Sequence, residues 1–203
     1  MIVKKILFLT FFAACTYPPY RPVPVPTDLP SYSELKNSFI SCGGRGNISS
    51  TGNFSGKLSF SFLSQNDSSF FQFQDALGRK TLLMWITPES VNAWNILENR
   101  YYEYDAIRDF FPFLQVVKPD DITKFLWGIE PEYLEQDFTV LKENSVTMSI
   151  SFETESVEET LKGITKAVFN NSANHQKVVI RLSSRIHNVT PVDLAKAWDL
   201  MHS

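Results

Sequence analysis

Hydrophobic and polar side chains alternate along much of the chain after residue 54. Phe71 and Phe73 alternate with Gln72 and Gln74, a period of two that is typical of a strand with one buried face. Turn residues bound each segment of this kind. The pattern predicts strands over residues 47–50, 54–63, 91–96, 101–104, 138–142, 146–152, 163–169 and 178–186, and a strand–turn–strand hairpin over 70–86.

Four other segments carry the start and stop signals of helices. The expected helices cover residues 31–41, 106–114, 120–127 and 192–201. The glycines within residues 42–46 end the first helix, Asp105 caps the second, and Thr190 and Pro191 supply the N-cap and first helical position of the last. Residues 155–161 also fit a short helix, and the pattern alone does not decide their structure.

This order of elements predicts an α+β domain that is mainly β. Hairpins joined in sequence form an antiparallel meander, and such a sheet must cover one of its faces. Helices lying in the concavity of the sheet would cover that face and could leave an apolar cavity.

The tip of the 70–86 hairpin carries an unusual residue. Gly78 can supply the positive φ that a tight turn demands, but Leu77 is a large apolar side chain where little protein is near enough to bury it. One interpretation is that Leu77 folds back onto the core or is an ordinary exposed leucine. The other is that Leu77 is presented outward to lipid.

The N-terminus has the pattern of an export signal. Lys4 and Lys5 precede an apolar run over residues 6–12, and small residues then precede Cys15. Small residues directly before a cysteine are typical of a bacterial lipoprotein signal, although Phe12 stands where leucine is usual. The prediction is a signal peptide over residues 1–14 and an N-acyl diacylglyceryl group on Cys15. An ordinary secretion signal with an incidental cysteine is the alternative.

A proline-rich linker over residues 15–31 separates Cys15 from the folded part. It contains six prolines and fits an extended spacer of up to roughly 45 Å at about 3.1 Å per residue. Residues 32–203 then form one domain. Thr16, rather than aspartate, follows Cys15 and points to the periplasmic face of the outer membrane. Cys42 has no partner if Cys15 is acylated, and a Cys15–Cys42 disulfide would require the lipoprotein interpretation to be wrong.

Charge and missing motifs exclude several function classes. Without Lys4 and Lys5 the 19 basic residues become 17 against 22 acidic ones, a net charge of −5 with no basic block, so we expect no nucleic-acid partner. The three histidines, His175, His187 and His202, form no catalytic or metal-binding motif. We therefore expect no enzyme activity, no metal and no cofactor beyond the acyl group.

Three features together resemble the LolB family of outer-membrane lipoprotein receptors. They are the lipoprotein signal with its linker, the sequence Phe-Gln-Asp-Ala-Leu-Gly at 73–78 between two apolar strands, and Ile-Thr-Lys-Phe-Leu-Trp-Gly-Ile-Glu-Pro at 122–131. LolB proteins have a similar strand into Asn-Pro-Leu-Gly and a similar helix closing with Trp-x-Leu-Gly-x-Pro. The similarity covers residues 40–152 and is clearest in 70–131. Asp75-Ala76 replaces Asn-Pro, and the pattern is not matched after Phe152.

The resemblance implies a strongly curved antiparallel sheet, an unclosed barrel of the LolA/LolB type, covered by a few helices. It implies that Leu77 and Gly78 form a membrane-inserting tip. It also implies an apolar cavity for the acyl chains of lipoproteins, with a periplasmic LolA-like carrier as a candidate partner and a monomeric state. The expected cavity residues are Phe60, Phe62, Phe71, Phe73, Leu82, Met84, Trp94, Phe125 and Trp127.

Two functions follow from these expectations. The first is an anchored receptor that binds the acyl chains of lipoproteins and delivers them to the outer membrane. The second is a structural lipoprotein that keeps the fold as a scaffold of an envelope complex. A receptor needs an open apolar cavity and an exposed Leu77, whereas a scaffold could fill the cavity with aromatic side chains.

Overall fold

The structure is a computed structural model that describes residues 30–52, 55–110, 114, 116–133, 148–154, 163–172 and 175–202. The predicted signal peptide, Cys15 and most of the proline-rich linker lie outside the described residues. So do the predicted strand over 138–142 and the undecided segment over 155–161. Among the described helices, none is long and apolar enough to cross a membrane.

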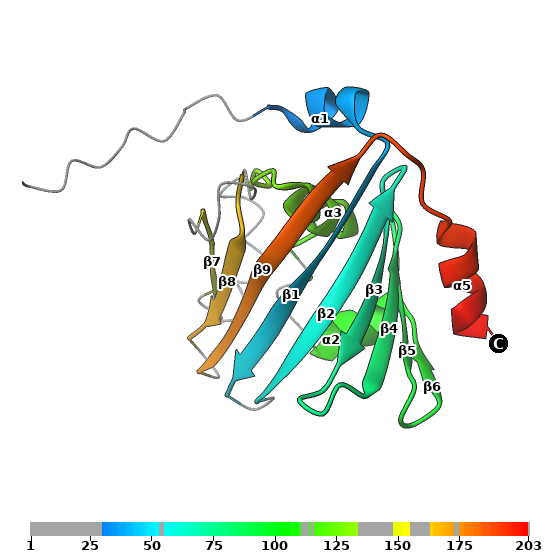
Figure 1. Ribbon diagram of the computed structural model, residues 1–203. Helices are drawn as coiled ribbons and strands as arrows, with labels where there is room; N and C mark the ends of the chain where they lie inside the picture. Colours follow the sequence, from blue (N-terminus) through cyan, green and yellow to red (C-terminus); the bar gives the residue numbers. More distant parts are fainter. Residues whose placement is uncertain are drawn as a thin grey trace, which may run out of the picture.

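Nine strands form one antiparallel sheet in the order β6-β5-β4-β3-β2-β1-β9-β8-β7 (Figure 1). Their bounds are β1 Ser41–Thr51, β2 Gly56–Gln65, β3 Ser68–Gln74, β4 Lys80–Ile86, β5 Val91–Asn95, β6 Arg100–Tyr102, β7 Met148–Glu153, β8 Lys166–Asn171 and β9 Gln176–Asn188. The edge strands β6 and β7 are not paired with each other, so the sheet is not closed. The predicted α+β class, mainly β with an unclosed antiparallel sheet, is confirmed.

Four described helices flank this sheet: α1 Tyr32–Ser38, α2 Tyr104–Phe110, α3 Pro119–Trp127 and α5 Leu194–His202. In Figure 1, α2 and α3 lie behind the sheet, on its inner face, and α5 lies on the other side. The helices therefore do not all lie in the concavity. Helix α5 covers Phe70 and Leu83 on the outer face, where its Ala197 is buried with them.

The glycines that were expected to end the first helix lie instead within β1. A Cβ on Gly44 would lie 2.7 Å from a ring carbon of Phe62, and one on Gly46 would lie 2.5 Å from a ring carbon of Phe60. The two glycines leave space for these rings on the inner face. The prediction of a strand only from residue 47 is therefore wrong: glycine weakens a strand alone, but here close approach by a neighbouring ring requires it.

Two helices begin at residues other than those predicted. Asp193 accepts a hydrogen bond from the Lys196 backbone N–H (3.0 Å), so α5 begins at Leu194 and the expected cap at Thr190 is wrong. Helix α2 begins at Tyr104, which places Asp105 in its first turn rather than at its cap. The expected end of α3 is confirmed, because Gly128 adopts a left-handed φ of 95°.

A β-bulge lies between β1 and β9. Gly46 pairs with Leu182 and Arg45 pairs with Ser184, which leaves Ser183 as the extra residue of β9. Strict alternation would put Leu182 and Arg185 on opposite faces. The bulge turns both toward the inner face, where they are 0% and 5% exposed.

Candidate functional site

The inner face of the sheet contains an apolar cavity of about 180 Å³. Every side chain that lines it is hydrophobic. They come from seven strands, from both helices on this face and from the segment that joins the helices: Ile48, Leu58, Phe60, Phe71, Phe73, Leu82, Met84, Ile86, Val91, Ile107, Leu114, Val117, Ile122, Phe125, Leu126, Phe169 and Ile180.

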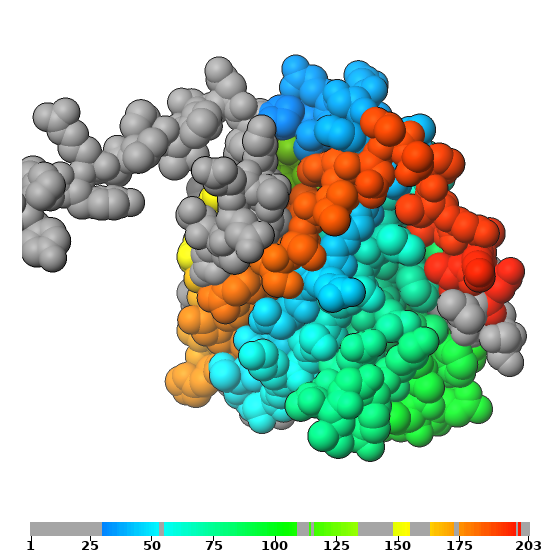
Figure 2. Space-filling model, in the orientation of Figure 1, coloured from blue at the N-terminus to red at the C-terminus, as the bar shows by residue number. Residues whose placement is uncertain are grey.

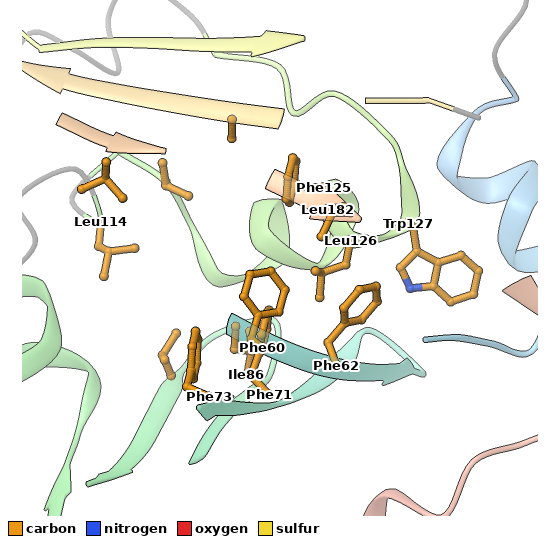
Figure 3. Close-up of a cluster of buried hydrophobic side chains, with 14 of the residues drawn as sticks. Phe60, Phe62, Phe71, Phe73, Ile86, Leu114, Phe125, Leu126, Trp127 and Leu182 are labelled. Atoms are coloured by element: carbon orange, nitrogen blue, oxygen red, sulfur yellow. The ribbon is translucent and has the colours of Figure 1, made fainter. Parts of the chain in front are cut away.

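A group of phenylalanines forms the floor of the cavity. Phe60 pairs with Phe73 and Phe62 with Phe71 across β2 and β3, so alternation turns all four toward the inner face. The Phe60 ring centroid lies 5.4 Å from that of Phe71 and 5.6 Å from that of Phe73. Figure 3 shows these rings facing Phe125 and Leu126 of α3 across the core.

Six of the nine predicted cavity residues line the cavity: Phe60, Phe71, Phe73, Leu82, Met84 and Phe125. Phe62 and Trp127 belong to the same hydrophobic core but lie beyond the cavity wall. The Trp127 indole N–H donates a hydrogen bond to Ser64 Oγ (2.9 Å), which fixes the ring against β2.

The placement of Trp94 in the cavity is wrong. In β5 the inward residues are Val91 and Ala93, so Trp94 faces the outer side, where it stacks on Tyr101. Only the phase of the strand decides this, and Val-Asn-Ala-Trp-Asn gives a weak alternation signal. The lining residues Ile107, Leu114 and Val117 were missed because they lie in α2 and the following segment, which has no period of two.

The C-terminal end of α3 is held rigidly over the sheet. The Arg185 guanidinium donates hydrogen bonds to Leu126 O (2.6 Å), Phe125 O (3.1 Å) and Ile164 O. Burial lowers the Arg185 pKa to about 10, which leaves it charged at neutral pH. Cys42 Sγ lies 3.7 Å from the same Leu126 O. These contacts supply hydrogen-bond donors to the last carbonyl groups of α3, which have no donor within the helix.

His187 continues this row of contacts. Its Nε2 lies 3.1 Å from Trp127 O, and because a carbonyl only accepts, Nε2 is the donor. The ring is stacked on Phe39, with centroids 5.2 Å apart. Burial lowers the His187 pKa below its usual value, so the neutral ring is favoured. The C-terminal end of α3, next to the cavity-lining Phe125 and Leu126, is therefore held by hydrogen bonds as well as by packing.

The opposite end of the cavity lies close to the β3–β4 hairpin tip. Phe73 and Leu82 line the cavity and pair with each other, one pair before the Gln74–Lys80 pair that adjoins the turn. Leu77 at the tip is 79% exposed, so it does not fold back onto the core.

The tip is held in shape by Asp75. Asp75 Oδ1 accepts from the N–H groups of Leu77 and Arg79, both at 2.9 Å, and Oδ2 accepts from Arg79 Nε at 2.7 Å. The backbone N–H of Arg79 is the main cause that lowers the Asp75 pKa. Gly78 takes a φ of 77°. Asp75-Ala76 stands where the similar turn has Asn-Pro. The hydrogen bonds of Asp75 thus supply some of the rigidity that this proline would give.

The cavity is small compared with ordinary ligand sites. Pockets for small molecules usually hold about 300–1,000 Å³, whereas an apolar void of about 150 Å³ holds one benzene. The 180 Å³ observed here fits a short length of hydrocarbon. A complete acyl chain requires the wall to move. Because α3 is held by Arg185, we expect the movement on the side of α2 and the hairpin tips.

In the part of the chain that the structure describes, no three His, Cys, Asp or Glu side chains gather as a metal site.

No family model and no curated protein matches the sequence. A DUF1329 family protein from Desulfovibrio piger is similar in structure, with 10% identity, a TM-score of 0.40 and coverage of 79% of this chain and 92% of that one. A candidate outer membrane lipoprotein-sorting protein domain from Vibrio parahaemolyticus has 6% identity, a TM-score of 0.40 and coverage of 84% and 96%. At these values neither comparison assigns a family or a function to this chain.

Proposed function

We propose that this protein is a lipid-anchored envelope protein that binds acyl chains of lipoproteins in its inner cavity and delivers them to a membrane. The observation that supports the proposal most is the all-apolar lining of the cavity, which leads toward an exposed leucine tip. Burying hydrocarbon there is favourable by roughly 25 cal/mol per Å² of apolar surface. Cys15 would carry the acyl anchor at the periplasmic face of the outer membrane.

The scaffold function remains the second candidate because of the cavity's size. Phe60, Phe71 and Phe73 occupy much of the inner face, as expected for a protein that keeps the fold without a cargo. The two functions differ in whether the cavity opens to take a chain. Binding in solution separates them.

The test uses a chain that begins at Thr16, which keeps every described helix and strand. An apolar fluorescent probe, N-phenyl-1-naphthylamine, should bind this chain, and a triacylated lipopeptide should displace it. Leu58→Trp places a larger side chain in the cavity and should weaken probe binding at least tenfold. Ser59→Trp lies on the same strand but on the outer face, where Ser59 is exposed and lines no cavity among the described pockets, and it should bind the probe as the wild type does.

Small-to-large changes in a core cost about 1–3 kcal/mol, so a urea melt must show that Leu58→Trp is folded. No probe binding at millimolar concentration, or equal binding by the two variants, would favour the scaffold function.

A further inference from the structure

A second exposed leucine lies at the same end of the sheet as Leu77. Leu97, in the turn between β5 and β6, is 62% exposed. In an antiparallel meander the turns alternate between the two ends, so the β3–β4 and β5–β6 turns lie at one end (Figure 1). The two turns are neighbours, because the Ile96 N–H donates to Thr81 O (3.0 Å) just after the β3–β4 turn.

Both turns are built on the same plan. Asn95 Oδ1 accepts from the N–H groups of Leu97 (3.1 Å) and Glu98 (3.2 Å), as Asp75 Oδ1 accepts from Leu77 N–H. In each turn a short polar side chain two residues before the leucine fixes the backbone. Each leucine is thus held outward at little further entropic cost.

An aromatic pair lies on the two strands that flank the Leu97 turn. Tyr101 is 52% exposed, and its ring stacks on Trp94 with centroids 5.5 Å apart and planes 5° apart. The Trp94 indole N–H donates to Asn99 Oδ1 in the turn (3.3 Å). Tyrosine and tryptophan are the residues enriched at the boundary between lipid and water, where one part of the ring is apolar and the other is wet.

The charge at this end is opposite to that of the whole chain. The chain has a net charge of −3. Among the described residues of this end, two are acidic, Asp75 and Glu98, and Asp75 is already paired with Arg79. Apart from Arg79 of this pair, four are basic and exposed, namely Lys57, Lys80, Arg100 and Lys177, against Glu98 alone. In the space-filling view of Figure 2, the regions of the β3–β4 and β5–β6 turns lie side by side at the lower edge of the molecule.

We propose that the β5–β6 turn is a second membrane-contacting tip, and that Leu77 and Leu97 enter a bilayer with anionic headgroups together. The basic residues face the headgroups, and the Trp94–Tyr101 stack lies at the lipid–water boundary. Two adjacent tips would hold the cavity end against the membrane in one orientation, which a single tip cannot do. This inference rests on the proposed function, since it extends the membrane contact assigned to Leu77.

Vesicle flotation of the chain that begins at Thr16, which has no acyl anchor, tests the second tip. Vesicles of phosphatidylethanolamine and phosphatidylglycerol should bind it, and Leu97→Glu should lower the partition coefficient at least fivefold, as should Leu77→Glu. Val189→Glu is the matched control: Val189 is 66% exposed and follows β9 at the opposite end of the sheet, so its partition should change less than twofold. If Leu97→Glu binds vesicles as Val189→Glu does, the second tip is refuted.

A probe on residue 97 provides an independent readout. Cys42 is fully buried, so a cysteine introduced as Leu97→Cys can be labelled selectively with an NBD fluorophore. Its emission should shift to the blue and increase on adding anionic vesicles, whereas the label on Val189→Cys should not respond. A label at 97 that stays in water while vesicles are bound would overturn the inference.

The headgroup charge is tested by Lys80→Gln with Arg100→Gln. The protein with both substitutions should lose binding to anionic vesicles, while its weak binding to phosphatidylcholine vesicles should stay unchanged. Equal loss with both lipids would refute the charged contact.

Failure of this inference is distinguishable from failure of the proposed function. Leu97→Glu should bind N-phenyl-1-naphthylamine as the wild type does, because Leu97 does not line the cavity. Probe binding without an effect of Leu97→Glu on vesicles would remove the second tip and keep the cavity function. Loss of probe binding in Leu97→Glu would show that the residue does not act at the membrane alone.

Discussion

Gly44 illustrates how much a single residue decides in this sheet. It lies where β1 passes both the ring of Phe62 and the backbone of β9. A Cβ at this position would lie 2.2 Å from Ser184 O and 2.7 Å from Phe62 Cε1. Neither neighbour can move freely, since one is a strand backbone and the other a buried ring.

We therefore predict that Gly44→Ala destabilises the fold by about 1–3 kcal/mol, the usual cost of overpacking a core. Urea denaturation followed by circular dichroism measures the change. Gly56→Ala is the control, because a Cβ at Gly56 meets nothing within 4 Å and surface changes usually stay within about 0.5 kcal/mol. Equal midpoints for the two variants would contradict this account of β1.

At the scale of elements, the position of α3 is set mainly by the hydrogen bonds that its last carbonyl groups accept. Its inward residues Phe125, Leu126 and Trp127 are at most 4% exposed. Packing alone would let such a helix slide along the sheet. The hydrogen bonds from Arg185 define one position, and the β9 bulge allows Arg185 to make them.

Replacing Arg185 by methionine should cost more than about 2 kcal/mol, because it leaves several buried carbonyls without their donor. The free energy of unfolding in urea is the measurement. Arg45→Met is the matched control, since Arg45 is exposed and lies on the outer face of β1, and it should change stability by less than about 0.5 kcal/mol. A small effect of Arg185→Met would mean that packing alone holds α3.

At the scale of the whole molecule, the β1–β9 pair joins the two halves of the chain. The residues in this pair are more than a hundred positions apart, and through them β6 to β1 and β9 to β7 become one sheet. Leu182 of β9 is fully buried in the shared core. Neither half covers its inner face alone.

The nine strands should therefore unfold as one cooperative unit. We predict that Leu182→Ala lowers the free energy of unfolding by roughly 2–5 kcal/mol and that tryptophan fluorescence and far-UV circular dichroism still report the same midpoint. Two of the four tryptophans, Trp85 and Trp94, lie in β4 and β5 and report on the first half of the sheet, whereas circular dichroism reports on all the strands. Separate midpoints would show that the half containing β9 unfolds first.

Local patterns were sufficient for the strands of the meander. Alternation grouped Phe60 with Phe62, Phe71 with Phe73, and Leu82 with Met84 on one face of each strand, because the side-chain period of a strand is fixed by backbone geometry. The structure turns these faces to the same side of the sheet. The turn at Leu77 and Gly78 also followed from sequence, as did the end of α3 at Gly128. These features depend on residues close together in the chain.

Features that depend on distant residues could not be predicted. Trp94 is predicted in the cavity but lies on the outer face, because five residues with small and polar neighbours do not define the phase of a strand. Likewise, the glycines of β1 predict the end of a helix, because the sequence does not show that the rings of Phe60 and Phe62 lie beside two of them. The position of α5 on the outer face depends on Phe70 and Leu83, far away in the sequence.

The sequence by itself determined the class of the fold, the meander and its buried aromatic face, because periodicity and turn chemistry are local. Only the tertiary structure decided which side chains share the cavity and how large it is. Only the structure, too, showed that Arg185 holds α3 and that Leu97 stands beside the Leu77 turn. The position of Arg185 depends on the β1–β9 register and its bulge, which arise only when strands from both halves of the chain meet. The place of Leu97 depends on the pairing of β4 with β5, which the pattern of either strand alone does not specify.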